Sequence, residues 1–249
     1  MSRFRQKLGV IGGMGTRATI SFLEKLADGT QTTEDQGFLE MMIHNNTAIP
    51  DRTQAIVYGG ESPLPSLLKS VEQLKPHVDF MVMTCITAYH YLEEIESHYE
   101  VDFLNPIDLT VSHLKKAYPE VDKVGLLATT GTIQTNLFSN ALISSELTPV
   151  MLNNSLQESL TMQAIYMPNG LKSGEIKQEA YEKVAEAVEV LKKQGAEVII
   201  AGCTELPLAL KKLAVPIPYV DPMEVLANEV LGYAKTANKE NKTEAIINQ

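Results

Sequence analysis

The 249-residue chain contains only two cysteines and no tryptophan. Two thiols are too few for the disulfide framework of a small secreted domain, so both sulfur atoms are expected to stay reduced. Long apolar runs are also missing. The run LGVIGG near the start is too short for the apolar region of a signal peptide, and no run approaches a membrane span. These absences predict a cytoplasmic protein without a membrane partner.

Positive charge is scarce, with 21 lysines and arginines against 31 aspartates and glutamates, a formal net charge of −10. Nucleic acids repel such a field, and no basic patch follows the short basic start of the chain, so no nucleic-acid partner is expected. Hydrophobic residues make up 44% of the sequence, which is enough to build one large core or two modest ones.

Short apolar runs alternate with longer amphipathic stretches along the whole chain. The run KLGVIGG precedes the helical pattern ATISFLEKLADG, and FLEMMIHNN, DFMVMTC, VDFLNP and KVGLLAT continue the alternation. Strands that alternate with helices are typical of stacked βαβ units, in which helices cover both faces of a parallel sheet. The predicted fold class is therefore α/β.

Two segments of the first half recur in the second half. KLGVIGGMGT begins at Lys7 and KVGLLATTGT at Lys123, 116 residues later, while DFMVMTC ends at Cys85 and EVIIAGC at Cys203, 118 residues later. Chance similarity of apolar strands is the alternative to a duplication. The repeat predicts two similar α/β domains, residues 1–106 plus 216–249 and residues 107–215, with the closing strand and helix returning to the first.

The duplication places each cysteine at the carboxyl end of a parallel strand, where open α/β sheets bind their ligands. Neither cysteine has the close neighbours of a metal site, and a buried core role is the bland alternative. An acyl-transfer nucleophile would need a histidine such as His90. Two opposed thiols fit better with moving a proton from one face of a carbon to the other, one as base and one as acid.

Local sequence supports such chemistry at both strand ends. Thr204 is a candidate helix N-cap directly after Cys203, with Thr87 in a similar place after Cys85, and a helix start lowers the pKa of a thiol. The glycine-containing turns GGMGT and ATTGT offer backbone N–H groups to an anion. A loose dinucleotide fingerprint in GGMGTRA lacks its acidic partner, because MMIHNN ends in asparagine.

Six motifs follow one another along the chain in this order: LGVIGGMG, HNNTAIPDRT, TCITA, LLATTGT, IY…LKSG and AGCTELPLAL. Together they resemble the aspartate/glutamate racemase family, most of all its cofactor-independent aspartate racemases. The resemblance implies two α/β domains related by pseudo-twofold symmetry, an active site between them, and a homodimer. It also implies 1,1-proton transfer at the α-carbon of an amino acid, with no metal and no pyridoxal phosphate.

Individual residues carry over from the family motifs. Cys85 and Cys203 match the two catalytic cysteines, while Arg52 of PDRT and Lys172 match cations that hold the distal carboxylate of the substrate. The backbone of Met14 matches a wall of the α-carboxylate pocket. The substrate-binding positions implied are Met14, Arg52, Ile86, Thr87, Thr129, Thr132, Lys172, Thr204 and Glu205. Without the family, each threonine is better explained as a cap or turn residue.

The chain departs from the family after the first cysteine. Ile86 stands where asparagine is common, and Tyr89 stands where histidine is common. The stretch YMPNGLK before the lysine is also longer than usual. These departures leave the reaction class unchanged but bear on the choice of substrate. Aspartate remains the first expected substrate, and glutamate or a broad set of amino acids is the second. Two further alternatives stay open. The chain could be weakly active and mainly bind a dicarboxylic ligand, or it could use the two thiols for hydrolysis or decarboxylation.

Overall fold

The computed structural model describes residues 4–236, and its strands form two parallel sheets. The first sheet has the order β2-β1-β3-β4 and the second the order β6-β5-β7-β8. The strands are β1 (Leu8–Gly12), β2 (Met41–Asn45), β3 (Phe80–Met83), β4 (Asp102–Phe103), β5 (Lys123–Leu127), β6 (Thr148–Val150), β7 (Val198–Ala201) and β8 (Tyr219–Val220). The two orders are equivalent when β1 is matched to β5, so the duplication read from the sequence is confirmed at the level of strand order.

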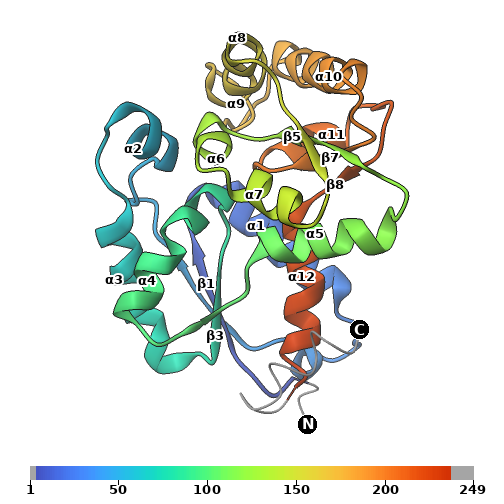
Figure 1. Ribbon diagram of the computed structural model, residues 1–249. Coiled ribbons are helices and arrows are strands. Elements are labelled where there is room, and N and C mark those ends of the chain that lie inside the picture. Colours follow the sequence, from blue (N-terminus) through green and yellow to red (C-terminus); the bar gives the residue numbers. More distant parts are fainter. Residues whose placement is uncertain (1–3, 237–249) are drawn as a thin grey trace.

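Helices surround both sheets, which lie one above the other in the molecule (Figure 1). The α-helices are α1 (Thr16–Gly29), α2 (Arg52–Tyr58), α3 (Leu64–Leu74), α4 (Leu92–His98), α5 (Pro106–Ala117), α6 (Thr130–Gln134), α7 (Leu137–Ser144), α8 (Asn154–Leu156), α9 (Gln163–Tyr166), α10 (Gln178–Lys193), α11 (Leu206–Leu210) and α12 (Pro222–Tyr233). A π-helical segment, 157–162, joins α8 to α9, and 3-10 turns span 35–37, 75–77 and 86–91. The α/β fold class is confirmed.

The central strands consist of apolar residues because helices cover both of their faces. Every residue of β1, β3 and β7 is buried, which is the pattern of a parallel strand inside an α/β sheet. Cys85 belongs to a core cluster that includes the first sheet and also Val124 and Val198 of the second sheet, whereas Cys203 belongs to a separate cluster of the second half. The two sheets therefore share part of one core, and the two cysteines lie in different clusters.

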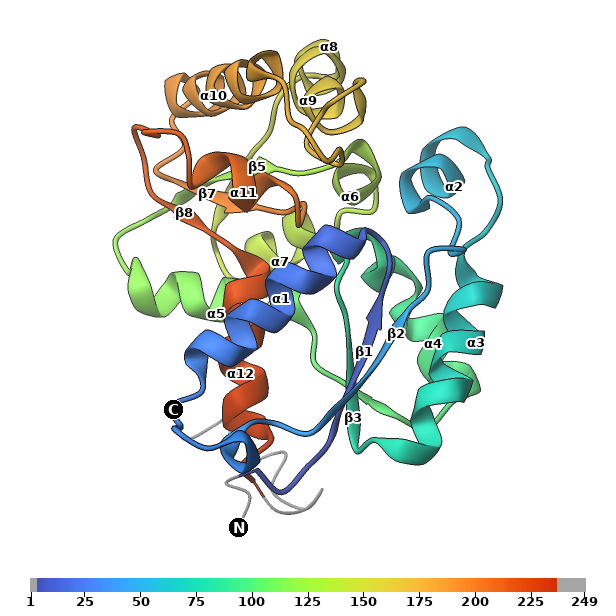
Figure 2. The ribbon, with the colours of Figure 1, turned by 180° about the vertical axis from the view of Figure 1, so that it is seen from behind.

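The chain returns to the first half only with its last helix. Strand β8 pairs with β7, Ile199 opposite Tyr219, so the expectation that this strand lies in the first half is wrong. Helix α12 does return: it packs against α1 and α5, as Figure 2 shows for α1, and the Tyr233 ring lies 4.9 Å from that of Phe80. The domain boundaries themselves stay a prediction, and residues 237–249 lie outside the described part.

Equivalent helices of the two halves begin in the same way. Asn105 caps α5 and Asp221 caps α12; each side chain accepts a bond from a backbone N–H two residues on, at 3.0 and 2.9 Å, and a proline follows each cap. Proline suits the first helical position because its missing N–H would have no partner there. This shared start is a further trace of the repeat.

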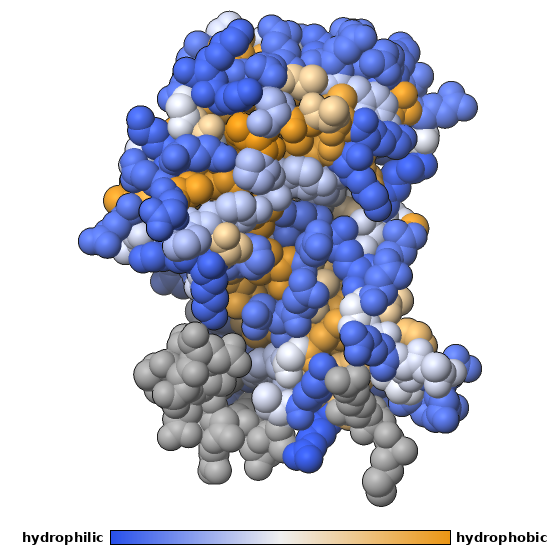
Figure 3. Space-filling view, turned by 90° about the vertical axis from the view of Figure 1, so that its right-hand side faces the viewer, coloured by the Kyte–Doolittle hydropathy of each residue, from blue (hydrophilic) through white to orange (hydrophobic). Residues whose placement is uncertain are grey.

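The outer surface is mixed in character. In the side view of Figure 3, polar residues cover the upper edge of the molecule, and apolar residues gather in patches below it. Within residues 4–236, no helix combines the length and the apolar character needed to cross a bilayer.

Candidate active site

The two cysteines meet at one small cavity between the sheets. Cys85 follows the end of β3 by two residues and Cys203 follows the end of β7 by two, so the equivalent strands deliver their thiols to the same place. The side chains are only 7% and 8% exposed. The cavity volume is about 20 Å³, which is room for little more than one water molecule. The halves therefore hold this site nearly closed.

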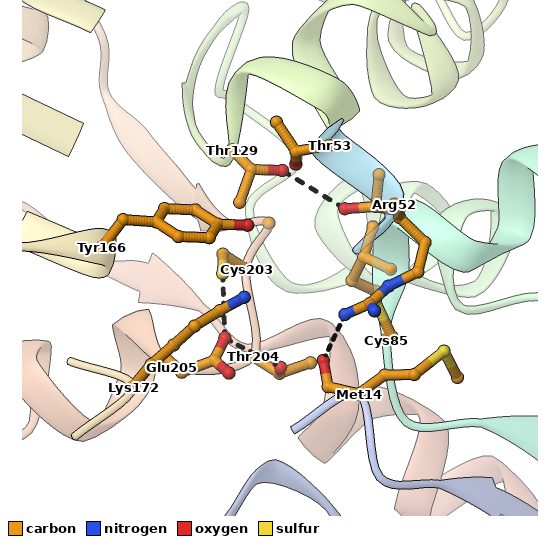
Figure 4. Close-up of a pocket in the computed structure, with 13 residues that line it drawn as sticks. Met14, Arg52, Thr53, Cys85, Thr129, Tyr166, Lys172, Cys203, Thr204 and Glu205 are labelled. Atoms are coloured by element: carbon orange, nitrogen blue, oxygen red, sulfur yellow. Dashed lines mark hydrogen bonds between the residues drawn. The ribbon is translucent and has the colours of Figure 1, made fainter. Parts of the chain in front are cut away.

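Almost all of the predicted site residues line this cavity. Figure 4 shows Met14, Arg52 and Cys85 on one side and Lys172, Cys203 and Glu205 on the other. The predicted residues that line it are Met14, Arg52, Cys85, Ile86, Thr87, Thr129, Lys172, Cys203, Thr204 and Glu205. Thr132 lies behind this wall and reaches it through hydrogen bonds. Sequence reasoning missed three lining residues, Thr53, Tyr166 and Gly202.

The glycine turn after β1 shapes the cavity floor. Gly13 has a φ of +89°, and a Cβ at this position would collide with the backbone of Asn46, so only glycine fits. The turn directs the Met14 carbonyl oxygen toward the guanidinium of Arg52, which donates to it at 2.7 Å. The predicted contact of the Met14 backbone with the site is thus present, with Arg52 as its partner.

Arg52 is held in place by backbone oxygens. It is the first residue of α2, because the Asp51 side chain caps the helix by accepting the Gln54 N–H at 2.9 Å. Its second terminal nitrogen donates to the Pro50 carbonyl at 2.9 Å, and the residue is 7% exposed. Burial acts to lower the pKa of Arg52, but the neighbouring Cys85 sulfur and Asp51 carboxylate raise it overall. A permanent positive charge therefore faces the first cysteine.

Cys203 has the opposite surroundings. Its thiol donates to the Glu205 carboxylate at 3.0 Å, and the Thr204 hydroxyl donates to the same oxygen at 3.2 Å. Burial, together with the negative charge of Glu205, raises the pKa of Cys203 well above its ordinary value. The prediction of a lowered thiol pKa is wrong here, because the nearby carboxylate and burial oppose the helix start. Thr204 is not the cap either: α11 begins one residue later, with Glu205 at its N-cap position.

A clasp of three residues, Asp51, Tyr166 and Lys172, joins the halves at the cavity rim. The Asp51 carboxylate accepts the Tyr166 hydroxyl at 3.0 Å and the Lys172 ammonium at 3.3 Å. Lys172 also lies over the Tyr166 ring, 4.1 Å from its centroid. Burial acts to lower the pKa of Lys172, but the negative groups around it raise it overall. Burial raises the pKa of Tyr166 to about 12. Despite the long YMPNGLK stretch, Lys172 reaches the site.

The clasp also separates the cavity from the outside. A groove of about 410 Å³ beside it shares Met14, Arg52, Lys172 and Glu205 with the cavity and includes Asp51 in its wall. Asp51 and Tyr166 stand inside the motifs PDRT and IY…LKSG. The motifs were visible in the sequence, but a contact between residues 115 positions apart was not.

We expect Asp51→Asn to weaken the clasp while leaving α2 capped, since asparagine caps as well as aspartate. Both partners are partly exposed, so the free energy of unfolding at pH 7 should fall by about 0.5–1 kcal/mol. Burial raises the pKa of Asp51, but the Gln54 N–H, Lys172 and Arg52 lower it overall. The charge therefore contributes above the ordinary aspartate pKa, and its contribution is lost as the pH falls through the lowered one.

Urea unfolding of the wild type and Asp51→Asn at pH 7 and at about pH 3 tests this. The difference between the two proteins should shrink at the lower pH. Tyr166→Phe is the matched control, because it removes one bond to Asp51 without removing a charge. A wild-type advantage that is equal at both pH values would contradict the electrostatic explanation.

Three threonine hydroxyls form a triangle across the halves. Thr87 lies 3.2 Å from Thr129 and 2.8 Å from Thr132, and the latter two are 3.1 Å apart. Thr129 also caps α6 by accepting the Thr132 N–H at 3.3 Å. Thr87 does not cap a helix as predicted, since it lies inside the 3-10 turn 86–91 that follows Cys85. Its hydroxyl instead bonds to Thr129 and Thr132 at the cavity wall.

The two departures from the family pattern have different consequences. Ile86 is 2% exposed and lines the cavity, where its side chain offers no hydrogen bond. Tyr89 is not among the lining residues. Its hydroxyl accepts the Met83 N–H at 3.0 Å and donates to the Leu104 carbonyl at 3.1 Å. Ile86 alone therefore alters the cavity chemistry.

Two known proteins resemble this chain over nearly its whole length, and a third resembles it over part of its length. The broad specificity amino-acid racemase RacX of Bacillus subtilis (strain 168) is 26% identical over 231 residues, covering 90% of this chain and 96% of the relative. A glutamate racemase of Helicobacter pylori (strain G27) is 28% identical over 152 residues, 59% of this chain and 55% of the relative. The structure of Picrophilus torridus aspartate racemase superposes with a TM-score of 0.80 at 28% identity, covering 95% of this chain and 97% of that one.

The family profile described as Asp/Glu/Hydantoin racemase matches residues 11–230. This match includes all of the strands except the first three residues of β1, both cysteines and all of the cavity walls described above. The chain therefore belongs to the Asp/Glu/hydantoin racemase family.

Proposed function

We propose that this protein racemises amino acids by passing a proton between Cys85 and Cys203 without pyridoxal phosphate. The observation that carries the proposal is the delivery of one thiol from each sheet to a single cavity. A thiolate on one side of the α-carbon takes its proton, and the thiol on the other side supplies a proton to the opposite face. One acid and one base are enough for this reaction, so the chain's own residues supply both.

The remaining walls supply charges and donors for an amino acid. Proton removal leaves negative charge on the α-carboxylate, which is stabilised by fixed donors in a water-excluded site. The Thr87 and Thr129 hydroxyls offer such donors in the cavity, and the start of α1 offers backbone N–H groups at the neighbouring groove. Arg52 and Lys172 add two positive charges for carboxylates.

Aspartate is the first substrate that we propose. Its second carboxylate suits Arg52 and Lys172, and the name of the Picrophilus torridus relative agrees with it. Glutamate or a broader set of amino acids is the second, because Ile86 removes a polar contact and the Bacillus subtilis relative is described as broad in specificity. The homodimer implied by the family resemblance and the cytoplasmic location expected from the missing apolar runs stay predictions.

A second candidate function is binding without appreciable turnover. Ile86 favours it, because a side chain without hydrogen bonds next to Cys85 holds a substrate less firmly. Such a protein would bind a dicarboxylic ligand through Arg52 and Lys172 and exchange its α-hydrogen slowly or not at all.

A screen of the proteinogenic amino acids and their D-forms in D₂O, without added cofactor, tests the proposal. We expect loss of optical rotation together with one deuterium at the α-carbon, strongest for aspartate. Isothermal calorimetry on the same compounds gives binding. Binding of aspartate without deuterium uptake would favour the second candidate, and net formation of a new product would point to hydrolysis or decarboxylation.

A further inference from the structure

The two cysteines have unlike neighbours, although their strands are equivalent. The guanidinium of Arg52 lies on the same side of the cavity as Cys85, where its positive charge interacts with the Cys85 sulfur. On the second side, the Cys203 thiol donates to a carboxylate at 3.0 Å. A cation stabilises a thiolate, whereas a carboxylate stabilises the protonated thiol that donates to it.

The Glu205 carboxylate is directed at Cys203 and its neighbour Thr204, and not at the other residues of the cavity. The residue is 3% exposed, and one oxygen of its carboxylate accepts both the Cys203 thiol and the Thr204 hydroxyl. No salt bridge to Glu205 occurs within residues 4–236, since the nearby Lys172 pairs with Asp51. A buried carboxylate with few donors depends on the thiol proton for its solvation.

We propose that Glu205 is a positioning residue that keeps the proton on Cys203, so that Cys203 is the protonated thiol, and hence the acid, of the resting site. The charged and titratable groups around Cys203 are Glu205 on its own turn, Tyr166 and Lys172 from the segment at the rim, and Arg52 and Cys85 across the cavity. Of these, Glu205 alone accepts a hydrogen bond from the thiol.

The catalytic meaning of this asymmetry rests on the proposed racemase function. In the resting state Cys85 removes the α-proton of one enantiomer, and Cys203 delivers its own proton to the opposite face. The site is then left with a thiol at Cys85 and a thiolate at Cys203 beside Glu205. Because two negative charges face each other there, this second form is higher in energy, and the site returns to the resting form by moving a proton back.

The test uses thiolate absorbance near 240 nm, taken as the difference from a Cys85→Ser/Cys203→Ser variant so that the tyrosinate absorbance cancels, and needs no turnover. The chain has two cysteines, so Cys85→Ser leaves Cys203 as its single thiol. Adding Glu205→Gln to this variant should move the appearance of the thiolate to lower pH by about one unit or more, because the facing negative charge is gone. Glu205→Asp keeps the charge and should restore much of the original titration. In Cys203→Ser, the same Glu205 changes should have little effect on Cys85.

Glu158→Gln is the matched control, since its carboxylate also accepts a threonine hydroxyl, that of Thr130 at 2.6 Å, and lies outside the cavity. It should leave the Cys203 titration unchanged. An unchanged titration in Glu205→Gln, or an equal shift at Cys85, would overturn the proposal even if racemisation is observed. Conversely, a wild type that racemises nothing would refute the proposed function and leave the titration result standing.

Kinetics give a second readout for an active enzyme. Enantiomers have equal free energy, so kcat/KM must be the same in both directions for every variant. Glu205→Gln should therefore change kcat by one factor for one enantiomer and by a different factor for the other. In each direction KM should change along with kcat, so that kcat/KM stays equal in the two directions. A role of Glu205 in packing alone would alter both directions alike, and that outcome would argue against the proposal.

Discussion

Cys85→Ala and Cys203→Ala should each lower racemisation of aspartate by about 10²–10⁴-fold, the usual contribution of a positioned acid or base. Each substitution removes one partner of a two-partner reaction, so the double variant should lose little more than the worse single one. Deuterium uptake in D₂O separates the roles. A variant that retains its base for one enantiomer should still exchange the α-hydrogen of that enantiomer slowly, without inverting it.

The controls for these variants concern folding, because both cysteines are buried in core clusters. Ser139→Ala removes another buried small polar side chain, 6% exposed and outside the cavity, and should keep full activity. Thermal unfolding should show that each cysteine variant is folded at the assay temperature. Full turnover in both directions with either thiol absent would refute the two-cysteine mechanism.

Arg52→Ala is expected to lower kcat/KM for aspartate by about 10²-fold or more, because it removes a fixed positive charge beside Cys85 and a carboxylate partner. It also leaves the Met14 and Pro50 carbonyl oxygens without their donor, so the free energy of unfolding should fall by about 2–4 kcal/mol. If Arg52 binds the distal carboxylate, the loss should be larger for aspartate than for alanine. Steady-state assays with both amino acids measure the difference.

Arg52→Lys keeps the charge but not the fork that reaches two carbonyl oxygens, so it should recover only part of the lost activity. Arg17→Ala is the matched control. Arg17 also donates to a backbone carbonyl, that of Gly174 at 3.2 Å, but it is exposed and does not line the cavity. Equal losses for aspartate and alanine would assign Arg52 to the thiolate and the local fold rather than to the substrate side chain.

The sequence was most informative where a pattern repeats. Two segments spaced by 116 and 118 residues predicted the equivalent strands, and those strands deliver Cys85 and Cys203 to one cavity. The family motifs predicted the remaining wall residues. All of these motifs except IY…LKSG, which lies at the end of α9 and in the turn after it, include or follow the end of a strand. The loops after parallel strands converge at the same edge of a sheet, so their meeting follows from topology alone.

Sequence reasoning failed where the outcome depends on contacts between distant segments. Local rules favoured Thr204 as a helix cap and a lowered pKa for Cys203. The Glu205 carboxylate accepts the thiol proton of Cys203 and, together with burial, raises the pKa of Cys203 instead. The clasp from Asp51 to Lys172 spans 121 positions and leaves no local signature. The segment 216–220 has the composition of a strand, but composition does not say which sheet it joins.

The late return of α12 determines how the protein can fold while it is being synthesised. This helix covers α1 and places Tyr233 against Phe80 of the first sheet, yet it begins 119 residues after Phe103, the end of that sheet's last strand. At common translation speeds the interval is roughly 10 s. Throughout that time the nascent first half lacks one of its walls, so its apolar face must be shielded by chaperones or by the emerging second half.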